Sequence, residues 1–201
     1  MNALQERAFY KTRWLIRRFA DDAAFARDEA SEVVGGDGQM LPAESVIEGN
    51  ILLSEGIGEL WDLVCGLGSP TAFDNTNAYI GVGDSTTAES AAHTDLQAAS
   101  NKTYKAMAAT YPQRSGTTVT FQAAMASGDA NYSWQEFTVA NASSGTGKNL
   151  NRKVSNQGSK VAGQVWTIQL QITISRRWLY EVTYGTCKRE VDGLSERHLS
   201  R

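Results

Sequence analysis

Hydrophobic and polar positions alternate most regularly in "QVWTIQLQITIS" (164–175), near the end of the chain. Successive side chains of a β-strand point to opposite faces, so this period of two predicts a long strand with one dry face. We expect Gln169 and Gln171 to point away from the core. The alternation resumes in "WLYEVTY" (178–184), after a break at Arg176. The apolar positions that we expect in the core are Trp166, Ile168, Leu170, Ile172 and Ile174.

Several shorter segments also favour strands, and glycine-rich turns separate most of them. Their aromatic and β-branched content is typical of strands, and their spacing is typical of an antiparallel sandwich or barrel. We therefore predict a mainly β domain, a sandwich or barrel-like fold with one packed helix and extended terminal arms. The predicted strands lie in 7–19, 78–87, 102–112, 116–126, 130–142 and 148–155.

One segment has helical rather than strand periodicity. Apolar residues recur every three or four positions, which predicts a helix over about 54–66 that "GLGSP" ends and that Ser54 caps. We expect Trp61 to be buried against the sheet, and we expect Gly56 and Gly58 to let another backbone approach closely. The apolar positions are Ile57, Leu60, Trp61, Val64 and Leu67.

The pattern suggests three parts of the chain. Residues 1–45 are predicted to form an N-terminal arm, within which 21–30 is a short helical or looped link. Residues 46–184 form the β domain, and the polar residues 185–201 form a C-terminal tail. Deletion of residues 1–20 is expected to leave the β domain folded.

Composition and charge restrict the classes of partner. The 201 residues are 41% hydrophobic, include 18 glycines and carry a net charge of −3, so no overall basic field attracts nucleic acid. No window reaches the ~18 apolar residues that a membrane-spanning helix needs. The start of the chain lacks the apolar core of a secretory signal, and two cysteines make no disulfide framework, so we expect a cytoplasmic site of synthesis. Basic residues cluster with aromatic ones in 13–19 and 175–182, whereas the middle of the chain is acidic.

The sequence contains no convincing catalytic, cofactor-binding or metal-binding motif. His93 and His198 have no metal-ligand neighbours at local spacing, and "DNTN" and "GDST", which could offer oxygens to calcium, are more typical of turns. The glycine-rich "IGVGDS" (80–85) and "SSGTGKNLNR" (143–152) lack the remaining residues of phosphate-binding loops.

A carbohydrate-binding site is a further hypothesis that the sequence raises. Tyr132, Trp134 and Glu136 would share one strand face and could form a platform for a sugar, although core packing of the aromatic residues is favoured. A carbohydrate-active enzyme would also need a second carboxylate about 5–10 Å from the first, and no partner for Glu136 is evident in the sequence.

The order of several weak motifs resembles that of small structural proteins of tailed-bacteriophage virions. The stretches are "EGNILLSEGIGELWDLVCG" (48–66), "AYIGVGDSTTAES...TDLQ" (78–97) and 119–154, which contains "WQEFTVANA" and "LNR", followed by the alternating strand. The resemblance covers roughly 46–175. It implies no enzyme activity and no cofactor, and it offers no catalytic residues.

The resemblance implies a capsid decoration (cement) protein on the outer head surface, or alternatively a tail or fibre component that binds a host receptor. The expected location is the virion, and the expected partners are the major capsid protein or neighbouring virion proteins. A homo-oligomer is expected, with a trimer favoured, and neither nucleic acid nor membrane is an expected partner. The two basic-aromatic clusters are the expected anchors, because Arg and Trp often dominate protein interfaces. The predicted intersubunit contacts are Arg13, Trp14, Arg17, Arg18, Arg176, Arg177 and Trp178.

Overall fold

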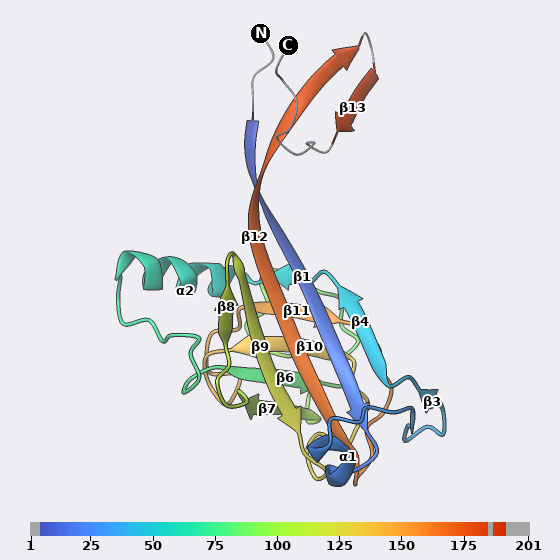
Figure 1. The fold of residues 1–201 in the computed structure, drawn as a ribbon. Coiled ribbons are helices and arrows are strands. Elements are labelled where there is room, and N and C mark those ends of the chain that lie inside the picture. The colour runs from blue at the N-terminus through green and yellow to red at the C-terminus, as the bar shows by residue number, and fades with distance from the viewer. Residues whose placement is uncertain (1–4, 185–186, 192–201) are drawn as a thin grey trace.

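The protein is mainly β, with two antiparallel sheets that face each other as a sandwich (Figure 1). The computed structural model describes residues 5–184 and 187–191, with side chains from Phe9 to Arg176. The first sheet has the order β4-β1-β12-β9-β8, with β13 paired to β12, and the second has the order β5-β11-β10-β6-β7. The predicted mainly β antiparallel class is confirmed, whereas the structure has two helices where one packed helix is predicted.

The strands of the first sheet are β4 (Glu44–Glu48), β1 (Gln5–Phe19), β12 (Val165–Tyr184), β9 (Thr118–Met125), β8 (Gln113–Ser115) and β13 (Cys187–Val191). Those of the second sheet are β5 (Ile51–Leu52), β11 (Asn151–Val154), β10 (Glu136–Ala140), β6 (Tyr79–Gly83) and β7 (Lys102–Ala106). A small hairpin pairs β2 (Val33–Val34) with β3 (Met40–Leu41), and the helices are α1 (Asp22–Ala26) and α2 (Ser54–Cys65).

Aromatic residues fill the space between the two sheets. The Trp134 ring lies 4.8 Å from Trp166 and the Phe137 ring 5.8 Å from Trp14, measured between centroids. Side chains at alternate positions of β12 point into this core, as the opening pattern predicts: Trp166, Ile168, Leu170 and Ile172 are buried.

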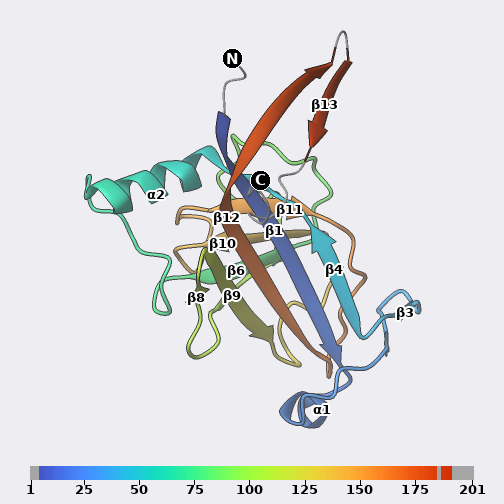
Figure 2. The ribbon, with the colours of Figure 1, turned by 45° about the horizontal axis from the view of Figure 1, so that its top comes forward.

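The alternating strand differs from its prediction at one position, because Ile174 is 56% exposed. The paired register of β12 with β9 ends at Thr173, and the backbone N–H of Ile174 makes one further hydrogen bond on that side, to the carbonyl oxygen of Thr117 at 3.2 Å. The register is continuous through this point, and the exposure therefore reflects the departure of β12 from the sandwich rather than a bulge. Figures 1 and 2 show β1 and β12 continuing together beyond the sandwich.

The predicted extent of the N-terminal arm is wrong. Residues 13–19 of β1 lie inside the first sheet between β4 and β12, and the side chains of Trp14, Ile16 and Phe19 are fully buried. Deletion of residues 1–20 would therefore remove a central strand and part of the core, so we now expect the truncated domain to be unfolded.

Helix α2 is present at the predicted residues, but its orientation is the reverse of the prediction. Trp61 is 62% exposed, whereas Gly56 and Glu59 are buried. A Cβ atom on Gly56 would lie 2.5 Å from the Cα of Leu150, so only glycine allows the observed close packing. Gly58 has nothing comparable nearby.

The ends of α2 follow the sequence only in part. Gly66 ends the helix in the left-handed conformation, with φ 65°, as the glycine-rich stop predicts. The N-cap position belongs to Leu53, which makes no side-chain cap, so Ser54 begins the helix rather than capping it. Within the described residues, no helix is long and apolar enough to cross a membrane.

Candidate functional site

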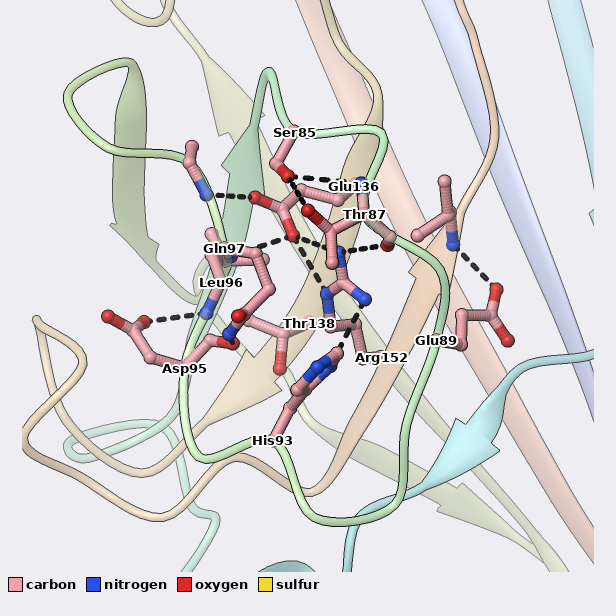
Figure 3. Close-up of polar contacts among 12 residues, drawn as sticks. Ser85, Thr87, Glu89, His93, Asp95, Leu96, Gln97, Glu136, Thr138 and Arg152 are labelled. Atoms are coloured by element: carbon pink, nitrogen blue, oxygen red, sulfur yellow. Dashed lines mark hydrogen bonds and ion pairs between the residues drawn. The ribbon is translucent and has the colours of Figure 1, made fainter.

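The most buried charges in the described part of the chain form one ion pair, between Glu136 on β10 and Arg152 on β11 (Figure 3). The distance from Nη2 of Arg152 to Oε2 of Glu136 is 2.7 Å, and neither side chain has any exposed surface. Buried charges are destabilising unless they are paired and hydrogen-bonded, so the other partners of this pair determine its role.

Those partners belong to residues 84–101, a long loop that covers the second sheet opposite the core. Glu136 accepts hydrogen bonds from the backbone N–H groups of Gln97 and Ala98, at 2.9 and 2.7 Å. Arg152 donates to the carbonyl oxygens of Thr87 and Ala88, at 2.9 and 3.3 Å. The ion pair therefore fastens this loop to the sheet.

This arrangement does not resemble a hydrolytic site. Both carboxylate oxygens of Glu136 are occupied by hydrogen bonds from the chain, and the charged neighbour is an arginine rather than a second carboxylate. The Nδ1 atom of His93 lies 3.3 Å from Nη1 of Arg152. Trp134 is in the core, as favoured above, and Tyr132 donates a hydrogen bond to Val82, so the two do not form a sugar platform with Glu136.

A second group of contacts fixes the same loop to helix α2. Asn149 donates from its side chain to the carbonyl oxygen of Thr94, at 2.8 Å, and its backbone N–H donates to Glu55, at 2.7 Å. The hydroxyl of Tyr104 donates to Asp95 in the loop. Burial, followed by this hydrogen bond to a carboxylate, raises the pKa of Tyr104 well above its usual range.

Two of the predicted intersubunit residues are instead part of the core. Trp14 is fully buried, and Arg18 is 1% exposed. The guanidinium group of Arg18 donates to Pro42, Ser45 and Gln157, and burial lowers its pKa to about 10. The prediction of intersubunit contacts is wrong for these two residues, because alternate positions of β1 face inward.

The remaining predicted contact residues differ in whether their charge is already paired within the chain. Arg17 forms ion pairs with Asp28 and Glu44 of the same chain, and the hydrogen bond that it donates to Asp28 is the main cause of its raised pKa. Arg13 is half-buried, and Arg176 is exposed; neither forms an ion pair with a described residue. The side chains of Arg177 and Trp178 lie outside those that the structure describes.

Two exposed features remain at one end of the sandwich. The first, here called the arm, is the pair of strand segments 5–11 and 174–184 that continues beyond the sheets. The second, here called the apolar stripe, runs along α2 and just past its end. Tyr10 of the arm donates a hydrogen bond to Asn50, close to the start of α2, which places the two features at the same end. The stripe consists of Ile57, Leu60, Trp61, Val64 and Leu67, which are 38–75% exposed.

Within the described residues, no group of three or more histidine, cysteine, aspartate or glutamate side chains is placed to hold a metal ion. Comparisons with protein-family models, with curated proteins and with solved structures find no match to this chain.

Proposed function

We propose that this chain is a non-enzymatic structural protein of a tailed-bacteriophage virion, which binds the outer surface of the head as an oligomer. The observation that carries the proposal is the apolar stripe on α2. Contiguous apolar surface is uncommon on monomeric proteins and marks sites of contact with other molecules. The stripe uses the helical period that normally faces a core, which supports an assembly role.

The motifs that carry the resemblance have a shared physical role, because several of their residues hold the loop of residues 84–101 in place. A Cβ atom on Gly83, in "GVGD", would lie 2.5 Å from Oε1 of Glu136, so glycine leaves room for the buried carboxylate. Glu136 and Arg152 supply the ion pair, and Asn141 of "ANA" donates to Glu59 of α2, at 2.9 Å. The motifs thus occur together because they form one connected set of contacts, which supports treating their order as a single signature.

The chemistry of the described residues also supports a structural role. The buried pair is used to hold a loop, and the exposed features are apolar or basic surfaces rather than a lined catalytic cleft. The proposed partners are the major capsid protein or neighbouring virion proteins, together with further copies of this chain. The net charge of −3 gives no support to a nucleic-acid partner.

A tail or fibre component is the second candidate, because a projecting two-stranded arm also suits attachment to a tubular structure. Copy number separates the two. Quantitative mass spectrometry of purified particles, with cryo-electron microscopy to place the density, should find a copy number comparable to that of the major capsid protein. A few copies per particle would instead support the tail component. Absence from purified particles would refute both.

A further inference from the structure

Acidic and basic residues are separated along this chain to an unusual degree. Residues 28–101 contain 13 of the 22 Asp and Glu residues and none of the 19 Lys and Arg residues. This acidic segment includes α2 and the loop that the buried ion pair fastens, and all basic residues lie before or after it. Ion pairs within the chain use part of this segment, such as those of Arg17 with Asp28 and Glu44, so the charges available to a partner are those without such a pair.

The separation is repeated in the two exposed features. Helix α2 carries no basic residue, and since Glu59 is buried and Glu55 accepts a hydrogen bond from Asn149, Asp62 is the carboxylate that α2 has available to a partner. The arm presents Lys11 and Arg176, both exposed and without an ion pair to any described residue. Complementary charges on two surfaces steer association and fix which surfaces meet.

The apolar surface follows the same division. On the arm, Ile174 is 56% exposed, and on α2 the exposed fraction reaches 62% at Trp61 and 75% at Val64. A two-stranded ribbon that projects from its sheet is marginally stable in water and gains from packing against a further element. Each feature therefore lacks an apolar partner that the other could supply.

A single copy does not make this contact with itself. The arm projects beyond the sandwich, whereas α2 extends away to one side, and the two views agree on this divergence (Figures 1 and 2). The exposed fractions along the stripe show that nothing in the described chain covers it.

We propose that the arm of one copy lies against the apolar stripe and Asp62 of α2 in a second copy. The contact joins two different surfaces, so it is heterologous, and repetition gives a closed ring or an open chain of copies. This inference rests on the oligomeric part of the proposed function and names the surfaces that carry it.

Sedimentation analysis of the full chain tests the contact with three variants. Trp61→Ala removes the largest side chain of the stripe. The double change Lys11→Glu with Arg176→Glu reverses the charge of the arm. Asp62→Lys reverses the charge that α2 offers beside the stripe. Wild-type protein is expected to associate at micromolar concentration and to dissociate as salt is raised. Trp61→Ala should weaken association by about 30-fold, as expected for an interface hot spot.

Mixing the two charge-reversed proteins gives the sharpest result. Each is expected to be monomeric alone. The mixture should form a dimer, because the intact arm of the helix variant meets the intact helix of the arm variant. Contacts of arm with arm or of helix with helix would give no such recovery. The matched controls are Met40→Ala, also at a 62% exposed apolar residue, and Arg27→Glu on α1; both should associate as the wild type does.

A monomeric wild-type chain would overturn the inference, as would variants that associate normally or a mixture that stays monomeric. The virion proposal fails on a different result. A chain that is monomeric in solution but present on particles at full copy number contradicts only the arm-to-helix contact. A chain that forms the contact but is absent from particles contradicts only the virion role.

Discussion

Replacement of Arg152 by methionine should strongly destabilise the protein. The change removes both hydrogen bonds to Glu136, at 2.7 and 2.8 Å, and those to the carbonyl oxygens of Thr87 and Ala88. Glu136 would then remain as a fully buried carboxylate without a counter-charge. Breaking one side of such a pair costs roughly 3–5 kcal/mol.

Urea unfolding followed by tryptophan fluorescence measures this loss, because Trp14, Trp134 and Trp166 are fully buried and report on the core. In thermal unfolding, a chain of this size should lose roughly 10 °C. The loop should also loosen, so limited proteolysis is expected to cut within 84–101 in Arg152→Met before it cuts the wild type.

Two further proteins make the interpretation specific. The double variant Glu136→Gln with Arg152→Met removes both charges and should lose less free energy of unfolding than the sum of the two single changes. Arg27→Met applies the same substitution to the exposed ion pair with Glu29, where a much smaller loss is expected because solvent screens the two charges. A loss for Arg152→Met no larger than that of Arg27→Met would refute the view that the buried pair holds the loop.

Three smaller perturbations are predicted. Trp61→Ala should change the free energy of unfolding of the monomer by less than ~1 kcal/mol, because the side chain is 62% exposed; a loss of several kcal/mol would place it in the core. Gly56→Ala should destabilise the protein by forcing α2 away from its neighbour, whereas Gly58→Ala should be neutral or stabilising by up to ~1 kcal/mol, and equal effects in chemical denaturation would contradict the close contact. Asp129 has its pKa lowered from 3.8, chiefly by a hydrogen bond from Lys105, so its contribution to stability is present above that value and is lost as the pH falls through the folded-state pKa. The stability difference between wild type and Asp129→Asn, followed by unfolding across the acid range, should therefore shrink below about pH 3.8; a constant difference would show that the carboxylate charge contributes nothing.

Local periodicity predicted the elements well because it reflects how side chains alternate within a single segment. The long strand, the helix and the mainly β class all follow from it. The orientation of α2 could not be predicted in this way. An apolar stripe normally faces a core, but here Gly56 packs against the backbone of Leu150, and Glu59 accepts hydrogen bonds from Thr71 and Asn141. These contacts turn the stripe outward, and they depend on segments distant in the sequence.

The buried ion pair was missed for a related reason. The sequence shows Glu136 as a carboxylate among aromatic residues, but the arginine that pairs with it lies 16 residues away, on the neighbouring strand. Glu136 is the one charged residue of its strand, which was a usable signal, since a buried carboxylate requires a cation. Pairing of β10 with β11 was needed to identify Arg152. Likewise, only the sheet order showed that Trp14 and Arg18 face inward while Arg13 and Arg17 face outward.

The pairing of β1 with β12 affects how the chain can fold during synthesis. Phe19 lies opposite Val165, so β1 waits for roughly 150 residues to be made before its main partner exists. At translation rates of about 5–20 residues per second, this delay is on the order of 10–30 seconds. A strand with unpaired edges invites aggregation during that time. Strand β4, which pairs with residues 13–17 of β1, is made early and can cover one edge of the nascent strand, while the other edge stays open until β12 emerges.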